Sequence, residues 1–202
     1  RLSALPCDVL DGVRARDLVE SAVGYRGRLD GIAAIAGRGR HGSLLDLDPS
    51  DIADEIAAKV LGLLNVARPA LEYLAATSGR IVGVTAPTAR TPDPAMGAVG
   101  AGRAAVDNVL STLSTELAPR NIRVNGVGVG LVDTPRQHAR HAQTGDGEYQ
   151  EWIHGQADQR GIPLARPGTA EEVAAAICWL LSPASGYTTG SVIDVTGGHR
   201  SR

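Results

Sequence analysis

Apolar and polar positions along the chain follow two spacings, one typical of buried strands and the other typical of helices that pack on one side. Short apolar runs predict strands at 2–5, 29–36, 80–85, 122–129 and 192–195. Apolar residues three and four apart predict helices at 11–23, 52–75, 100–117 and 169–181. Strands and helices alternate, which predicts an α/β fold with a mainly parallel sheet.

The segments between these elements carry turn and loop signals. Three prolines between residues 86 and 97 predict a loop. The polar stretch 133–161 is predicted to be a surface excursion with a short helix near Tyr149. At 169–172 the pattern Thr-Ala-Glu-Glu predicts a capped helix start. No repeat or low-complexity tract divides the chain, so we predict a single domain over residues 1–202.

Composition and charge exclude several function classes. Twenty basic and 22 acidic side chains give a net charge of −2, which leaves no surplus positive charge for a dedicated nucleic-acid binder. The longest apolar run, 173–181, is far shorter than the roughly 20 residues of a membrane span. Cys7 and Cys178 suit no zinc motif and are predicted to be buried thiols of a cytoplasmic protein. Lys59 is the only lysine, so a mechanism that requires a lysine has one candidate.

Four stretches, in this order along the chain, resemble the classical short-chain dehydrogenase/reductase family. Residues 117–127 read LAPRNIRVNGV, 130–135 read GLVDTP, 163–173 read PLARPGTAEEV and 189–198 read TGSVIDVTGG. The resemblance implies a Rossmann-type three-layer sandwich that binds NAD(P) at the carboxyl ends of its strands. In that sheet we expect 122–129 to be central and 192–195 to lie at one end. It also implies that the chain begins at the family's third strand, with an N-terminal strand-helix-strand missing and the apolar edge of 29–36 unpaired.

The family transfers a hydride between NAD(P) and a carbonyl or alcohol with a Ser, a Tyr, a Lys and an Asn. Matched residue by residue, these four positions hold Ala86, Val99, Arg103 and Lys59, in that order. A valine has no proton to give, and no Tyr-x-x-x-Lys occurs anywhere in the sequence. The resemblance therefore implies a member with degenerate catalytic positions. Thr85 is a weak substitute for the Ser hydroxyl, or simply a β-branched strand residue.

The cofactor positions of the family are changed as well. No glycine-rich turn precedes Asp8, the family's Asn-Asn-Ala-Gly turn reads Ala-Ile-Ala-Gly at 34–37, and its Pro-Gly reads Val-Gly at 129–130. Asp8, Gly37 and Thr134 still match the family, although Asp8 is equally explained as a turn former at a strand end. We therefore expect no cofactor in this chain itself, with NAD(P) held by an active partner.

Two polar clusters suggest other sites. His138 and His141 are spaced to share a helix face and bind a metal, or to be solvated. Arg38, Arg40 and His41 form a basic loop that either meets a phosphate or carboxylate or is solvated.

The aromatic residues divide into two groups. Trp179 lies on an apolar helix and is predicted to be core. Tyr149 and Trp152 lie in 134–162, a region that forms a substrate lid in the family. Their side chains are expected to contact an apolar ligand or a partner.

Three functions are compatible with these observations. We expect a non-catalytic subunit that completes an active short-chain dehydrogenase in a hetero-oligomer, with a homo-oligomer as the alternative assembly. The helices 52–74 and 100–117, which family dimers pack together, are expected to form the contact. Their apolar faces are Ile56, Val60, Leu63, Leu64, Val106, Val109, Leu110 and Leu113. The alternatives are an NAD(P)-dependent oxidoreductase with an atypical site that acts on a carbonyl or alcohol, and a ligand-sensing binding module. No nucleic acid or membrane partner is expected.

Overall fold

The sheet at the centre of the fold is parallel throughout. A computed structural model describes residues 3–37, 39–144 and 147–199. Over these residues the strands are β1 (Gly31–Ala34), β2 (Arg80–Thr85), β3 (Arg123–Val129) and β4 (Val192–Val195). They lie in the order β1-β2-β3-β4, so β3 is internal and β4 forms one edge, which confirms the predicted placement.

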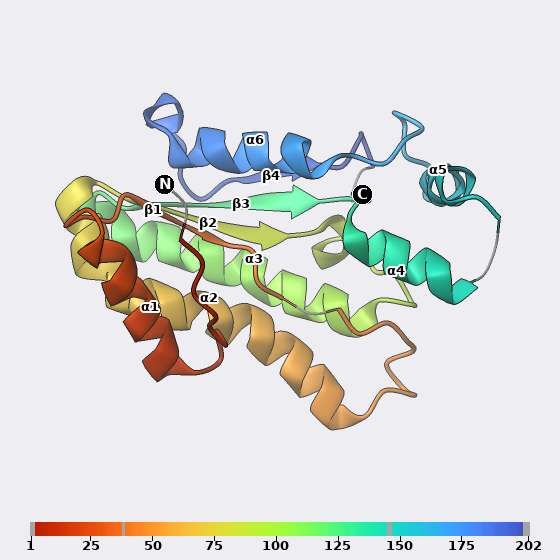
Figure 1. Ribbon diagram of the computed structural model, residues 1–202, viewed down its shortest axis with the longest axis horizontal. Coiled ribbons are helices and arrows are strands. Elements are labelled where there is room, and N and C mark those ends of the chain that lie inside the picture. Colours follow the sequence, from red (N-terminus) through yellow and green to blue (C-terminus); the bar gives the residue numbers. More distant parts are fainter. Residues whose placement is uncertain (1–2, 38, 145–146, 200–202) are drawn as a thin grey trace.

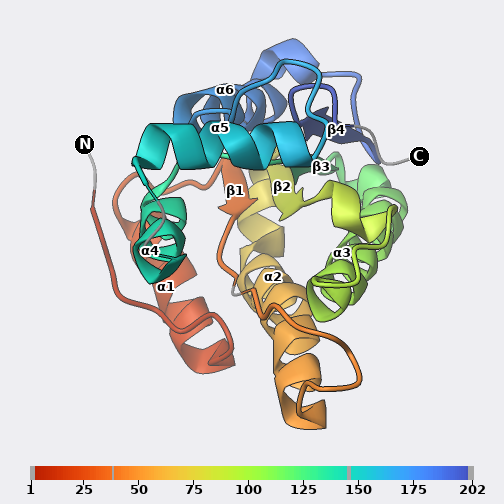
Figure 2. The same cartoon turned by 90° about the vertical axis from the view of Figure 1, so that its right-hand side faces the viewer.

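Helices cover both faces of this sheet and give the fold three layers (Figure 1). The helices are α1 (Gly12–Gly24), α2 (Pro49–Thr77), α3 (Gly97–Leu117), α4 (Pro135–Thr144), α5 (Tyr149–Gln159) and α6 (Ala170–Leu181). Short 3-10 turns lie at η1 (Pro87–Ala89), η2 (Ala118–Arg120) and η3 (Pro183–Ser185). α1, α2 and α3 lie on one face and α6 on the other. α4 and α5 lie beyond the carboxyl ends of the strands, nearest the viewer in Figure 2.

Local chemistry explains where the main helices begin. The Asp11 carboxylate caps α1 by accepting hydrogen bonds from two backbone amides, and Asp48 caps α2 just ahead of Pro49. α6 begins with a capping box, in which Thr169 and Glu172 each accept a hydrogen bond from the other's backbone N–H. The capped start predicted at 169–172 is confirmed.

The core lies on the two faces of the sheet because a parallel sheet must be covered on both sides. Between the sheet and α2 and α3, the fully buried side chains include Leu74, Ile81, Leu110, Ile122 and Val124. Between the sheet and α6, they are Val82, Val127, Ile177 and Leu180.

Glycines in the strands let α3 approach the sheet closely. A Cβ added to Gly83 would lie 2.9 Å from Cδ2 of Leu110, and one added to Gly126 would lie 3.1 Å from its Cδ1. These distances leave no room for a larger residue at Gly83, so the glycines there serve packing between helix and sheet.

Several predicted elements need correction. Residues 3–8 form no strand, although a strand was predicted at 2–5; Leu2 lies outside the described residues. Pro6 lacks an N–H, and within the described sheet no strand pairs with this segment. The strand predicted at 29–36 shortens to β1, which forms the other edge. The excursion 133–161 contains two helices rather than one.

Two predictions about burial also need correction. Cys178 is exposed and Cys7 is only partly buried, so neither is a fully buried thiol. Trp179 is 41% exposed rather than core. α6 directs Ile177 and Leu180 into the sheet, and the two positions between them therefore face outward. No helix in the described part of the chain is long and apolar enough to cross a membrane.

The apolar faces predicted for helix association are partly used inside the molecule. Leu63, Val106 and Leu110 are at most 3% exposed and belong to the core, because α2 and α3 pack on each other and on the sheet. Val60, Val109 and Leu113 pack partly against the same core. The apolar surface available for a partner is therefore smaller than the sequence suggests, with Leu61 exposed on α2.

Candidate functional site

A cavity of about 520 Å³ opens at the carboxyl ends of β2 and β3. It lies between the loop after β2, the start of α4 and the segment after α5. The residues at three of the four family catalytic positions line it, Ala86, Val99 and Arg103. The carboxyl ends of parallel strands are the usual place for a ligand in a fold of this kind.

One wall of this cavity is apolar. It is formed by Ala86, Met96, Val99, Val129, Leu131 and Ile162. Ala86 and Val99 stand where the family has a hydroxyl and a phenol, so this wall offers no proton to a bound ligand.

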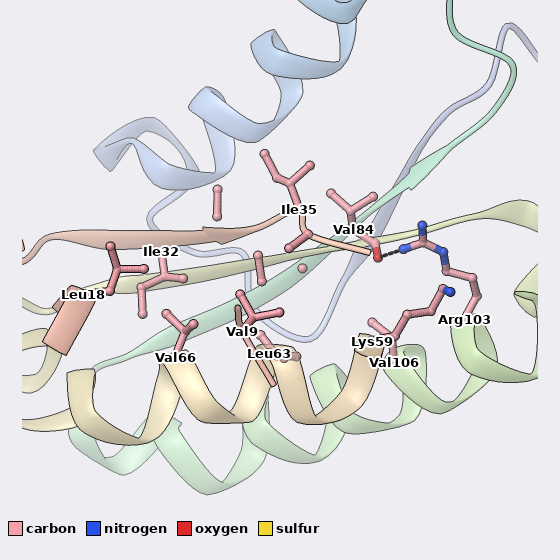
Figure 3. Close-up of a pocket in the computed structure, with 15 residues that line it drawn as sticks. Val9, Leu18, Ile32, Ile35, Lys59, Leu63, Val66, Val84, Arg103 and Val106 are labelled. Carbon is pink, nitrogen blue, oxygen red and sulfur yellow. Dashed lines mark hydrogen bonds between the residues drawn. The ribbon is translucent and has the colours of Figure 1, made fainter. Parts of the chain in front are cut away.

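Arg103 is the polar residue that faces both this cavity and a smaller one of about 160 Å³ beside it. Its guanidinium donates a hydrogen bond to the carbonyl of Val84, shown by the dashed line in Figure 3. Its Nε is buried and has no hydrogen-bond partner among the residues that the structure describes. Burial lowers the pKa of Arg103, and the Glu55 carboxylate opposes that shift. An arginine nevertheless stays charged at neutral pH.

Lys59 lies beside Arg103 on the wall of the smaller cavity (Figure 3). Its ammonium forms a buried ion pair with Glu55 one helical turn earlier, and both side chains are at most 1% exposed. Burial lowers the pKa of Lys59, and the hydrogen bond from its ammonium to Glu55 opposes the shift. The other carboxylate oxygen of Glu55 accepts a hydrogen bond from the backbone N–H of Arg40 at 3.3 Å. The Glu55 carboxylate thus lies near two cations, the buried ammonium of Lys59 and the partly buried guanidinium of Arg103.

Thr85 does not offer its hydroxyl to the larger cavity. The side chain is fully buried in β2, and its Oγ1 donates to the backbone carbonyl of Arg103 at 3.4 Å. Two other hydroxyls, those of Thr88 and Thr91, do belong to residues that line the cavity. Both oxygens are buried, and neither has a hydrogen-bond partner within the described ranges. Thr88 was not predicted from the sequence. It lies only two residues after the family's Ser position, and this closeness is the one sequence signal that could have identified it.

Three arginines and a histidine also line this cavity. Arg136 and Arg140 reach it from α4, Arg160 from the residue after α5, and His41 from the loop after β1. Asp93 is the one acidic residue among the described lining residues. Of these residues only His41 was predicted from the sequence as part of a site, because the arginines come from separate segments of the chain.

The residues matched to the family's cofactor positions lie outside both cavities. Asp8 is exposed, and its carboxylate accepts a hydrogen bond from the Leu10 N–H at 3.0 Å, the geometry of a turn former. Gly37 is exposed in the loop after β1. The Thr134 carbonyl accepts the Gln137 N–H at 2.8 Å as α4 begins.

The basic loop is only partly described. Arg38 lies outside the described residues. Arg40 pairs with Asp51 at 2.9 Å near the start of α2, so its charge is used within the fold.

Aromatic packing joins α4 to α5. The rings of His138 and Tyr149 stack with centroids 3.7 Å apart, and the Tyr149 hydroxyl donates to an oxygen of Asp133 at 2.5 Å. Burial and this hydrogen bond raise the pKa of Tyr149. His141 lies against Tyr149 and Trp152. In the described part of the chain no group of three or more ligating side chains is placed to hold a metal ion.

Comparisons with known proteins agree on one family. A family model described as enoyl-(acyl carrier protein) reductase matches residues 1–200. The chain is 33% identical over 192 residues to 3-oxoacyl-(acyl-carrier-protein) reductase FabG of Thermotoga maritima, covering 95% of this chain and 74% of that protein. It is 30% identical over 200 residues to oxidoreductase UcpA of Escherichia coli, covering 98% of this chain and 75% of that protein.

A solved structure adds a detail about the site. A short-chain oxidoreductase from Pseudomonas aeruginosa PAO1, solved with NADPH bound and described as containing an atypical catalytic center, superimposes with a TM-score of 0.92. The two chains are 35% identical, and the match covers 98% of this chain and 76% of that one. Among solved structures, this chain is therefore similar to one in which an atypical center and bound NADPH occur together.

Proposed function

The chain belongs to the short-chain dehydrogenase/reductase family, and from this premise we propose that it is an NAD(P)-dependent oxidoreductase that interconverts a carbonyl and an alcohol at an atypical site. The observation that carries the proposal is the cavity at the carboxyl ends of β2 and β3, where Ala86, Val99 and Arg103 meet. Its position and size suit a small-molecule site. The NADPH-bound relative with an atypical center supports the same reading.

The residues at this end of the sheet fit the nicotinamide half of a dinucleotide. The buried Nε–H of Arg103, unpartnered among the described residues, is the kind of donor that holds a hydroxyl or amide oxygen. Gly37 and Thr134 lie in the loops that follow β1 and β3 and would flank the cofactor. When bound, the cofactor supplies or accepts the hydride.

Arg103 would take the central role among this chain's own residues. Its guanidinium carries a fixed positive charge at the cavity wall, where it stabilises the negative charge that develops on the carbonyl oxygen. Ala86 and Val99 carry no exchangeable proton and cannot complete the alcohol, and we assign that proton to water. The Lys59–Glu55 ion pair lies beside Arg103, and the Glu55 carboxylate opposes the lowering of the Arg103 pKa by burial. Such a centre relies on electrostatics and positioning rather than on a side-chain acid.

This proposal departs from the expectation that the chain alone holds no cofactor. That expectation rests on the absence of a glycine-rich turn from residues 1–202, and it stays a prediction. The non-catalytic subunit also stays a prediction. The relatives named above are described as reductases or oxidoreductases, which favours an oxidoreductase over a subunit without chemistry.

The experiment follows the absorbance of reduced nicotinamide when the purified chain is mixed with NADPH or NADH and a panel of aldehydes and ketones. We expect turnover, and we expect Arg103→Ala to lower it about 100-fold by removing the charge. Arg68→Ala, which removes a charge from the exposed side of α2, is the matched control.

Arg103→Lys is the second variant, because Arg103 also anchors α3 to β2 through Val84. A lysine keeps the charge without the planar fork, so we expect intermediate activity from a folded protein. Absence of turnover in the wild type across the panel, or full activity of a folded Arg103→Ala variant, would overturn the proposal.

A further inference from the structure

The cationic wall of the larger cavity carries more charge than the proposed hydride transfer uses. We define the cationic wall as the part of the cavity lining formed by Arg136, Arg140 and Arg160, and the imidazole of His41 lines the same cavity. Arg103 adds a fourth guanidinium to the lining, and Asp93 is the one carboxylate among the described lining residues. The whole chain carries a net charge of −2, so this concentration of positive charge is local.

The arginines of this wall form no ion pair with a carboxylate of the described residues, although the charge of Asp93 acts on Arg160. Arg136 donates to the Gly39 carbonyl at 3.0 Å, and Arg140 donates to the Gln137 amide oxygen at 3.3 Å. By contrast, Arg28, Arg40, Arg90, Arg120 and Arg166 all pair with carboxylates elsewhere in the fold.

The groups of the cationic wall lie close enough to affect one another. Burial, and then the charges of Arg140, Arg136 and Arg160, lower the pKa of His41, while Asp93 opposes them. Burial and the charge of Arg140 also lower the pKa of Arg160, while the charge of Asp93 opposes them. Gathering like charges in a partly buried cavity is unfavourable unless an opposite charge joins them. The cavity is therefore suited to a bound anion.

Neutral donors stand in the same cavity. The Thr88 and Thr91 hydroxyls are buried and have no hydrogen-bond partner within the described part of the chain. A hydroxyl and a guanidinium both donate hydrogen bonds to oxyanions, and the guanidinium matches a carboxylate or phosphate in geometry. Ala86 and Val99 line the same cavity. The cavity thus offers both hydrogen-bond donors for an anion and apolar contacts for carbon.

We infer that this cavity selects carbonyl substrates that carry an oxyanion, a carboxylate or a phosphate, held by Arg140 and Arg160. The inference rests on the proposed function and adds its substrate class. The carbonyl group lies against Ala86 and Val99, beside Arg103. The hydride adds to the carbonyl carbon, the C=O π bond breaks, and water gives a proton to the oxygen. The oxyanion is unchanged and serves only for recognition.

The test compares matched pairs of probes that differ in charge. Acetoacetate is compared with its methyl ester, and dihydroxyacetone phosphate with dihydroxyacetone, first by calorimetric binding without cofactor and then by kcat/KM with NADPH. We expect the charged member of at least one pair to be preferred at least tenfold. The pair that shows the larger preference identifies a carboxylate or a phosphate as the recognised group.

Variants assign that preference to the cationic wall. Arg140→Gln and Arg160→Gln should each weaken anion binding about tenfold and leave the uncharged probes unchanged. Arg68→Gln removes the same charge from the exposed surface of α2 and should bind like the wild type. Circular dichroism and melting temperature show whether each variant is folded. Equal binding of charged and uncharged probes, or unchanged anion binding in both folded variants, would overturn the inference.

The two parts of the experiment separate the inference from the proposed function. Turnover of the neutral carbonyls with no preference for the anions refutes the inference and supports the function. Arginine-dependent anion binding without any NADPH oxidation supports the anion site and refutes the function. If saturating NADPH displaces the anion probes without a ternary complex, the arginines bind the cofactor and the substrate assignment is wrong.

Discussion

At the scale of single residues, the site depends on Arg103, whose charge takes the place of the acid that the family's tyrosine provides. Arg103 lies between two cavities, holds the Val84 carbonyl and keeps an N–H that is unpartnered among the described residues. Lys59, the only lysine, is committed to Glu55 in the interior. The closeness of Lys59 and Arg103 follows from their family positions. The cationic wall could not be predicted, because no local pattern shows that Arg136, Arg140 and Arg160 converge.

Restoring the family's phenol and ammonium tests whether the site is only a damaged copy of the usual one. We expect Val99→Tyr combined with Arg103→Lys to give no more turnover than Arg103→Lys alone. The new phenol would lack a hydroxyl partner at Ala86, which lines the same cavity. Initial rates with NADPH and the best carbonyl of the panel measure this. A double variant faster than the wild type would show that the usual acid–base mechanism is merely latent here.

At the scale of elements, boundaries were predictable wherever local chemistry fixes them. The strands at 80–85 and 192–195 are found at the predicted residues, and α6 begins at its capping box. α4 was missed because its sequence is polar and has no apolar stripe. Its contact with α5 depends on the stacking of His138 on Tyr149, which no helical spacing shows. The strand predicted at 2–5 failed because an apolar run becomes a strand only beside a partner.

The capping box of α6 gives a pH-dependent contribution to stability. Arg166 and the Thr169 N–H lower the pKa of Glu172 from 4.5 to about 2. Because the folded pKa is depressed, the contribution is full above the ordinary pKa of 4.5 and is lost as the pH falls towards about 2. We expect Glu172→Gln to lower the melting temperature at pH 7, with the difference shrinking over that window.

Glu171→Gln is the control for this measurement, because it removes the same charge from the same turn and leaves the capping box intact. Melting temperatures at a series of pH values would compare the two variants with the wild type. A Glu172→Gln effect equal to that of Glu171→Gln, or one that persists unchanged at low pH, contradicts the assignment.

The close approach of α3 to the sheet predicts a specific pair of stability effects. Gly83→Val places atoms where Leu110 lies, and overpacking of this kind costs about 1–3 kcal/mol. Leu110→Ala alone leaves a cavity and costs about 2–5 kcal/mol. In the double variant the new valine fills that cavity. The loss of stability measured for the double variant should therefore be smaller than the sum of the two single-variant losses. Urea unfolding gives all three values, and strict additivity would contradict the packing described.

At the scale of the whole molecule, the alternation of strands and helices predicted the parallel sheet, and the family resemblance predicted the places of its strands. It could not show how α2 and α3 divide their apolar residues between the core and the surface. Leu63, Val106 and Leu110 are buried, whereas Leu61 is exposed. β1 forms an edge of the described sheet, and Ile35 just beyond it is 58% exposed. Both features bear on assembly, which the fold of one chain does not determine.

We propose that the chain associates through α2 and α3, as the small exposed residues of α3 and Leu61 on α2 allow. Native mass measurement should find an oligomer, and Leu61→Glu should shift it towards monomer by placing a charge in the contact. Co-expression with an active family member distinguishes a hetero-oligomer from a homo-oligomer. A monomeric wild-type protein, or an oligomer indifferent to Leu61→Glu, would refute association through these helices.

The most direct test of the central claim follows the hydride itself. The purified chain is incubated with NADPH that carries deuterium on the nicotinamide ring and with an oxyanion-bearing ketone, and the alcohol is examined by mass spectrometry. We predict that the wild type transfers deuterium to the carbon of the former carbonyl and that Arg103→Ala transfers far less. An alcohol without deuterium, or a chain that neither binds nor oxidises NADPH even in the millimolar range, would contradict the assignment of this cavity as an oxidoreductase site.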